Sequence, residues 1–226
     1  MRTIAYVDGY NLYYGCLKHS PHLWLDVDRL VAGIVKIQDP AAELLRVRYF
    51  TAYIKARFAS NGEAAAQAQQ TYFKALRASG RVDIITGDHS LAPSWAVEYR
   101  EPPDKRQRVR IWRFEEKRTD VNLALSAYRD AAKGLVDQVV LVTNDSDITP
   151  AAVAIREDFP SIRIGVVFPI AQADPAGGRS HRPPCGDLIQ IADWTRRHVT
   201  DAELASAQFP PKVPTHKKPA IKPAHW

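Results

Sequence analysis

Short apolar runs rich in β-branched residues alternate with segments of helical periodicity along most of this chain. The apolar runs predict strands at 3–9, 44–54, 81–87, 138–143 and 162–170. Helical spacing of apolar residues predicts helices at 26–37, 61–80, 118–134, 149–159 and 186–199. Strands that are apolar on both faces and separated by helices are typical of a mainly parallel sheet covered on both sides. We therefore expect an α/β protein with a sheet of five or six strands.

The segments between these elements differ in character. Residues 88–107 are polar and are expected to form a surface excursion, with the alternating run 108–114 as its edge strand. Residues 171–184 read as a loop, and residues 201–226 as a Pro/Lys-rich C-terminal extension. The expected organisation is one domain over 1–200 followed by this extension.

Charge and cysteine content narrow the class of protein. The net charge of +6 hints at a polyanionic partner, and the stretch 100–118 holds eight Lys or Arg against four acids. Cys16 and Cys185 stand alone, without metal-ligand or disulfide spacing, as in reduced cytoplasmic proteins. No signal peptide or run of roughly 18 apolar residues is apparent. We expect a cytoplasmic protein with no membrane contact.

Acidic residues follow the predicted strands where a ligand would bind. Asp8 ends the first strand, Asp145 and Asp147 follow the fourth, and Asp120 lies in the first turn of the helix 118–134. Ligands of open parallel sheets bind at the carboxyl ends of the strands, so these four acids can converge. Their mutual repulsion is usually relieved by a hard divalent cation such as Mg²⁺ or Mn²⁺. Each acid alone also has a local explanation as a turn or helix-capping residue.

Three stretches containing these acids carry a family resemblance. "AYVDGYNLYYG", "EEKRTDVNLAL" and "VVLVTNDSDITP" resemble the three motifs of the NYN domain, the LabA-like branch of the PIN-like ribonuclease superfamily, over roughly residues 3–195. The resemblance implies a three-layer Rossmann-like fold and hydrolysis of RNA phosphodiester bonds, with single-stranded RNA as the expected partner and a homodimer as one assembly to consider. The motif match implies that Asp8, Asp120, Asp145 and Asp147 bind Mg²⁺ or Mn²⁺ and are catalytic. It places Asn11, Lys117, Asn144 and Ser146 at the substrate.

Two departures from the family pattern keep other functions open. Asn144 stands where many relatives have Gly, and Ser126 stands where relatives often carry another acid. A site without that acid would be weaker or hold one ion, which leaves room for a non-catalytic RNA- or nucleotide-binding module. Some chains with these motifs are assigned to hydroxylation of a pyridine catabolic intermediate. No GxGxxG dinucleotide motif follows the first strand to support that chemistry.

Overall fold

A seven-stranded, mainly parallel sheet forms the centre of the protein. The computed structural model describes residues 1–59, 61–172 and 182–226. The strands are β1 (Arg2–Asp8), β2 (Glu43–Ala52), β3 (Val82–Val97), β4 (Arg108–Lys117), β5 (Gln138–Val142), β6 (Arg163–Val167) and β7 (Trp194–Arg196). Their order is β4-β3-β2-β1-β5-β6-β7, and only the β3–β4 pair is antiparallel. The predicted α/β fold with a mainly parallel sheet is confirmed, with one strand more than expected.

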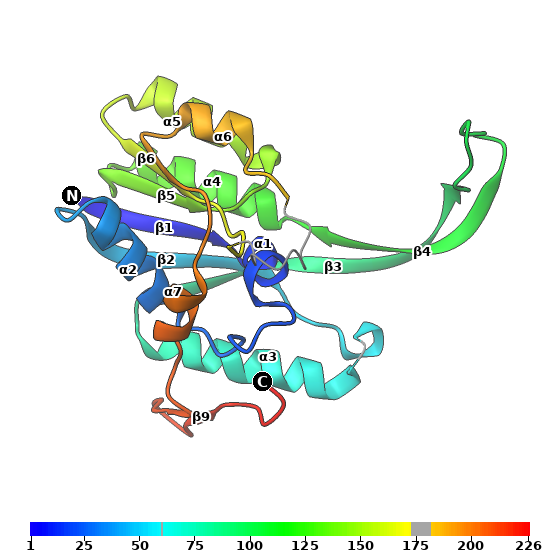
Figure 1. Cartoon of the computed structure of the whole chain (residues 1–226), viewed down its shortest axis with the longest axis horizontal. Helices are drawn as coiled ribbons and strands as arrows, with labels where there is room; N and C mark the ends of the chain where they lie inside the picture. Colours follow the sequence, from blue (N-terminus) through cyan, green and yellow to red (C-terminus); the bar gives the residue numbers. More distant parts are fainter. Residues whose placement is uncertain (60, 173–181) are drawn as a thin grey trace.

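Helices cover both faces of the sheet in three layers (Figure 1). The helices are α1 (Gly9–Leu12), α2 (Val27–Gln38), α3 (Gly62–Ala78), α4 (Thr119–Ala132), α5 (Thr149–Asp158), α6 (Gly186–Ile191) and α7 (Asp201–Ser206), with a π-helical turn η1 (Tyr13–Leu17) and 3₁₀ turns η2 (Ala56–Phe58) and η3 (Ser146–Ile148). One core cluster lies between the sheet and α2, α3 and α7, and the other between the sheet and α4, α5 and α6. Among the described residues, no helix combines the length and apolarity needed to span a membrane.

Strand β1 shows why the sheet is covered on both sides. Ala5 and Val7 pack into one core cluster, whereas Ile4 and Tyr6 pack into the other. Successive side chains of a strand point to opposite faces, so a strand that is apolar at every position needs a helical layer on each side. Because β1 is the central strand of the sheet, Asp8 at its end lies at the centre of the carboxyl edge.

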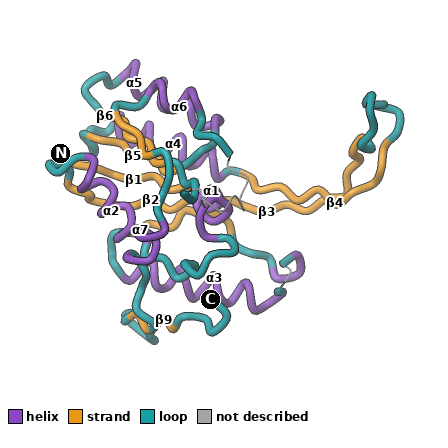
Figure 2. The backbone as a smooth tube through the Cα atoms, viewed as in Figure 1, coloured by secondary structure: helices purple, strands orange, loops and turns teal. Residues whose placement is uncertain are grey.

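Strand β3 has two parts with different partners. Val82–Gly87 pairs with β2, whereas Asp88–Val97 pairs only with β4 and extends away from the body of the protein as an arm (Figures 1 and 2). The expected edge strand 108–114 is confirmed and continues to Lys117. The third strand, predicted to end at residue 87, continues to Val97, so the first part of the expected surface excursion 88–107 is a strand. This strand was not predicted because no helical layer covers the arm. A strand exposed to solvent lacks the run of apolar residues by which buried strands are recognised.

The predicted helix 186–199 is also only partly correct. Helix α6 ends at Ile191, and residues 194–196 form β7 instead. Gly165 of β6 lacks the side chain that would collide with the Trp194 ring, and the Trp194 indole donates to Gln138 Oε1 at 2.9 Å. These tertiary contacts override the local helical pattern. Residues 173–181 of the predicted loop 171–184 lie outside the described residues.

The C-terminal extension packs against the α2–α3 side of the molecule. Its short strands β8 (Lys212–Val213) and β9 (Ala220–Ile221) pair with each other, and Val213 and Ala220 are buried. The Trp226 ring lies 5.6 Å from the Tyr72 ring and 6.0 Å from the Trp24 ring, measured between centroids. The Trp24 indole also donates to Pro210 O at 2.9 Å. The extension therefore contributes to the core on this side.

Candidate metal and substrate site

Asp8 lies at the carboxyl end of β1 and caps helix α1. Its Oδ1 accepts the backbone N–H of Asn11 at 2.9 Å, and its Oδ2 accepts the Asn11 side-chain amide at 2.5 Å and the Thr143 hydroxyl at 3.2 Å. Burial raises the pKa of Asp8 from 3.8 to about 6, with a further contribution from the charge of Asp120 and partial compensation by these hydrogen bonds. Asp8 is therefore a buried, strongly oriented carboxylate that carries an electrostatic cost when it ionises.

Gly9 allows the chain to turn at this point. A Cβ atom at this position would lie 2.7 Å from Phe50 O and 2.8 Å from the Tyr49 hydroxyl. The close approach of α1 to β2 therefore requires glycine after Asp8. The Asp-Gly pair is a structural requirement here as well as part of the motif.

The turn from β4 to α4 supplies two further acids, Glu116 and Asp120. Burial raises the pKa of Glu116 from 4.5 to about 7, against the hydrogen bond from the Thr119 hydroxyl and with the help of the charges of Asp8 and Asp120. Arg118 between them has a left-handed backbone (φ 76°) and forms a 2.6 Å ion pair with Asp88. Non-glycine residues rarely adopt this conformation, and such strain concentrates at functional sites.

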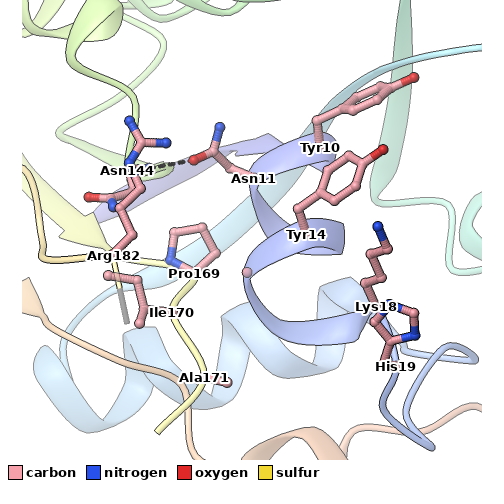
Figure 3. Close-up of a pocket in the computed structure, with 11 residues that line it drawn as sticks. Tyr10, Asn11, Tyr14, Lys18, His19, Asn144, Pro169, Ile170, Ala171 and Arg182 are labelled. Atoms are coloured by element: carbon pink, nitrogen blue, oxygen red, sulfur yellow. Dashed lines mark hydrogen bonds between the residues drawn. The ribbon is translucent and has the colours of Figure 1, made fainter. Parts of the chain in front are cut away.

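The segment after β5 contributes the remaining predicted residues. Asp145 Oδ1 accepts the backbone N–H of Asp147 at 3.0 Å and so caps the 3₁₀ turn η3. Asn144 is buried, and its backbone N–H donates to Asn11 Oδ1 at 3.1 Å (Figure 3). Ser146 and Asp147 are exposed to solvent. Local turn chemistry therefore accounts for part of this polar stretch, and the carboxylate of Asp147 faces outward.

The four predicted acids and Glu116 form one electrostatic network. Burial raises the pKa of Asp120 first of all, and the charges of Asp145 and Asp147 raise it further. Asp120 in turn acts on both Asp8 and Glu116. Within the described part of the chain, no three His, Cys, Asp or Glu side chains have the arrangement of a preformed metal site. The acids thus converge on one region without surrounding a single point.

Lys117 and Ser126 are placed less directly at the site. Lys117 Nζ lies 3.3 Å from Glu115 Oε2, and both residues alternate along β4 with Glu116. Alternation puts the Lys117 side chain on the opposite face of the strand from Glu116. Ser126 is half-buried in α4. Glu116 was not among the residues singled out from the sequence, although the alternation of β4 through "EEK" could have indicated it.

Tyr10, Tyr49 and His89 lie beside the acids, and neither Tyr49 nor His89 was singled out from the sequence. The Nδ1 of His89 donates to Tyr53 O at 2.9 Å, so its Nε2 accepts the hydrogen bond from the Tyr10 hydroxyl. Burial lowers the pKa of His89, which favours this neutral form. Burial raises the pKa of Tyr49, and the charges of Asp8 and Glu116 raise it further. No sequence pattern joins these residues, because three separate strands or turns bring them together.

Two cavities adjoin the acids. The first, of about 460 Å³, has a mixed lining, with Tyr10, Asn11, Tyr14, Lys18, Asn144 and Arg182 as polar or basic members beside the apolar Pro169, Ile170 and Ala171 (Figure 3). The second, of about 520 Å³, is lined by aromatic residues that include Tyr10, Tyr13, Tyr49, Tyr72, Phe73 and Trp226, together with aliphatic and polar ones. Tyr10 and Tyr14 line both cavities, which places these two rings between them.

Asn144 holds two loops together, which gives a prediction about stability. Its Oδ1 accepts the Cys185 N–H at 2.8 Å, and its Nδ2 donates to Pro183 O at 3.1 Å. Asn144→Ala removes both hydrogen bonds and is expected to lower the free energy of unfolding by about 1–3 kcal/mol, since each bond contributes about 0.5–1.5 kcal/mol. Ser146→Ala, an exposed change in the same loop, should alter it by about 0.5 kcal/mol or less. Urea denaturation measures both, and equal stability of the two variants would contradict a structural role for Asn144.

A mainly parallel α/β sheet with acids at the carboxyl edge of its strands is consistent with the PIN-like class of folds. The sequence model of the NYN domain matches residues 2–170, and the chain belongs to the NYN domain family. It is 37% identical over 246 aligned positions to 6-hydroxy-3-succinoylpyridine 3-monooxygenase HspA of Pseudomonas putida, covering 100% of this chain and 75% of that protein. A protein of unknown function from Vibrio parahaemolyticus has a similar crystal structure, with 18% identity and a TM-score of 0.49 over 88% of this chain and 93% of that one. At that TM-score the likeness supports no conclusion about function.

Proposed function

We propose that this protein is a divalent-metal-dependent ribonuclease that hydrolyses phosphodiester bonds of RNA. The observation that carries the proposal is the electrostatic network of Asp8, Glu116, Asp120, Asp145 and Asp147 at the carboxyl edge of the sheet. Perturbed carboxylates are a feature of functional sites, and membership in the NYN family points to nuclease chemistry. The neighbouring cavity with Lys18 and Arg182 supplies positive charge suited to phosphate groups.

The donor set suits Mg²⁺ or Mn²⁺. These ions prefer carboxylate oxygens and retain several waters, so they do not need a fully preformed protein cage. Asp8, Asp120, Asp145 and Asp147 would hold the ion, and its positive charge would offset the burial, and the smaller mutual repulsion, that raise the pKa of Asp8 and Asp120. When bound, such an ion supplies a Lewis acid for phosphodiester hydrolysis.

The other side chains have distinct roles in the proposed reaction. Glu116, with its pKa raised to about 7, can accept or release a proton at neutral pH. Asn11 fixes the orientation of Asp8 by donating to both of its oxygens. Lys18 and Arg182 would hold phosphates in the basic cavity, where the rings of Tyr10 and Tyr14 are available for stacking on bases. Lys117, Asn144 and Ser146 remain proposed substrate contacts, with Asn144 acting chiefly through the loops that it joins.

Asp145→Asn tests the proposed activity. Asn caps helical turns as well as Asp does, so the change removes the charge while it preserves the turn η3. We expect cleavage of labelled single-stranded RNA in Mg²⁺ or Mn²⁺ to fall at least about 100-fold, because several kcal/mol of transition-state stabilisation depend on the metal site. Asp137→Asn provides a matched control at the opposite end of β5, where Asp137 pairs with Arg2. Cleavage retained in Asp145→Asn, or absent from the wild type, would refute the proposal.

Assays on the same purified proteins distinguish two other functions from ribonuclease activity. A non-catalytic RNA-binding module would bind RNA without any divalent-dependent cleavage. Hydroxylation of a pyridine intermediate is favoured by the 37% identity to HspA and by the aromatic cavity, whose size suits a planar ring. That chemistry needs dioxygen and a two-electron reductant such as a reduced flavin or nicotinamide. Oxidation of NADH that depends on 6-hydroxy-3-succinoylpyridine, or a copurified flavin, would support it over the nuclease proposal.

A further inference from the structure

The projecting arm formed by residues 88–117 has two chemically different faces. Residues opposite each other in an antiparallel pair share a face, and the pairs alternate along the strands. Trp95 pairs with Arg110, Val97 with Arg108, and Pro93 with Trp112, and these residues share the face on which His89 and Glu116 form the base. We call this the aromatic face. The opposite face carries the charged Asp88, Glu115, Lys117 and Arg113, together with Val109, Ile111 and small residues.

The aromatic face is open to solvent. Trp112 is 69% exposed, Trp95 is 55% exposed and Val97 is 43% exposed. Two tryptophan rings on a two-stranded arm contribute little to a core of their own, and an isolated pair of strands is only marginally stable in water. Exposed apolar groups gathered in this way mark an interaction surface.

The charges on the two faces indicate the chemistry of the partner. On the opposite face, Glu115 lies 3.3 Å from Lys117 and 3.7 Å from Arg113, so the charges there are largely balanced. On the aromatic face, Arg108 and Arg110 have no carboxylate partner among the described residues. Arginine interleaved with aromatic rings is the combination that binds single-stranded nucleic acid, through phosphate contacts and base stacking.

The aromatic face also leads to the acids. Its base is formed by His89, which bonds Tyr10, and by Glu116, which is coupled to Asp8 and Asp120. Arg108 lies eight residues from Glu116 along β4, or ~26 Å at about 3.3 Å per residue. A surface for an unrelated protein partner would not need this continuity with the acidic region.

We propose that the aromatic face of the arm is a binding track for single-stranded RNA that leads several nucleotides of the substrate to the acidic site. Trp95 and Trp112 stack on bases, and Arg108 and Arg110 contact phosphates. The inference deepens the proposed ribonuclease function and rests on it for the identity of the ligand. It assigns substrate recognition to a segment that lies outside the three NYN motifs.

The test measures binding separately from cleavage. Fluorescence anisotropy with a labelled single-stranded 20-mer of uridine is performed in EDTA for the wild type, Trp95→Ala/Trp112→Ala and the control Ser94→Ala/Ile111→Ala. The control alters the opposite face between the same rungs. We expect the tryptophan variant to bind at least tenfold more weakly, because each lost stack costs about 1–3 kcal/mol, whereas the control should stay within twofold. Arg108→Gln/Arg110→Gln should reduce the slope of log K against log salt by about 1.4.

The outcomes distinguish this inference from the proposed activity. Equal RNA binding by the wild type and the tryptophan variant, or no RNA binding by the wild type, overturns the track. Dimerisation of the wild type that the tryptophan variant loses, with RNA binding unchanged, also overturns it and assigns the face to a second copy of the chain. RNA binding that depends on the tryptophans without any cleavage in Mg²⁺ or Mn²⁺ supports the track and refutes only the nuclease proposal.

Discussion

Asp8→Asn is expected to abolish RNA cleavage while making the folded protein more stable at pH 8. The carboxylate is the most deeply buried acid of the network, and its pKa of about 6 shows that the fold opposes its ionisation. Asn removes a charge that the proposed metal site needs, so cleavage should fall at least about 100-fold. The same change removes the cost of a buried charge, which a rise in pKa from 3.8 to about 6 places at ~3 kcal/mol at most.

The gain in stability should depend on pH in a defined direction. A carboxyl whose folded pKa lies above its unfolded value binds its proton more tightly in the folded state. The contribution of Asp8 to the free energy of unfolding of the wild type therefore falls as pH rises from about 4 through about 6, and then levels off. The advantage of Asp8→Asn should be absent near pH 4 and complete above pH 7. Thermal denaturation in metal-free buffer across this range measures it as a rise in Tm of a few degrees.

Calorimetric titration of Mn²⁺ into the metal-free protein completes this comparison. Saturable binding by the wild type that Asp8→Asn loses would link the unfavourable charge to cation binding. The expected increase in stability also separates a functional carboxylate from a structural one. If Asp8→Asn instead unfolds at lower temperature throughout the pH range, then the hydrogen bonds from Asn11 and Thr143 make Asp8 a structural cap, and its assignment to the metal site is wrong.

The position of the acids could be anticipated because strand ends are encoded locally. A buried run such as "IAYVD" ends where its apolar residues end, and parallel strands bring those ends to one edge of the sheet. Glu116 was not recognised because its position depends on β4 continuing past residue 114 and on which face each side chain takes. Arg182 and Lys18 belong to the adjoining cavity only through the path of separate loops.

Elements without a conventional core were the hardest to predict. The outer half of β3 is stabilised by its antiparallel partner while both of its faces meet solvent, so its sequence lacks the apolar periodicity of a buried strand. Strand β7 lies in a segment with helical periodicity, and the fit of Trp194 over Gly165 decides its conformation. In both cases a contact distant in sequence determines the structure, and local pattern analysis does not include such contacts.

Asp130→Ala is expected to cause the largest loss of stability. Asp130 lies on α4 under the sheet, where its carboxylate accepts the Tyr6 hydroxyl at 2.8 Å and the Arg48 guanidinium at 2.7–2.8 Å. The Asp130 side chain is only 2% exposed. Alanine leaves the Arg48 guanidinium, whose side chain is 19% exposed, without its counter-charge and the buried Tyr6 hydroxyl without its acceptor. Breaking one partner of such a buried pair costs about 3–5 kcal/mol, which urea denaturation would measure.

The exposed ion pair between Arg46 of β2 and Asp83 of β3 is a matched control for this prediction. Arg46, two residues before Arg48, pairs with Asp83 at 3.1 Å, but both side chains are more than 40% exposed. Asp83→Ala should therefore cost no more than about 1 kcal/mol. Replacing the whole buried pair, as in Arg48→Met/Asp130→Leu, should recover much of the stability lost in Asp130→Ala, since neither charge is then left unpaired. Equal losses in Asp130→Ala and Asp83→Ala would show that the pair contributes no more than a surface ion pair.

The position of Asp130 connects this stability effect to the candidate site. Helix α4 begins beside Asp120 and carries Asp130 two to three turns later, so the contact with β1 and β2 fixes the helix against the two strands that position Asp8. The variant Arg48→Met/Asp130→Leu should regain much of the lost stability. It nevertheless replaces this hydrogen-bonded contact with less directional apolar packing. We expect it to cleave RNA more slowly than the wild type at equal stability, which a single-turnover assay would detect. Full activity in the repacked variant would show that apolar packing alone is enough to position Asp120.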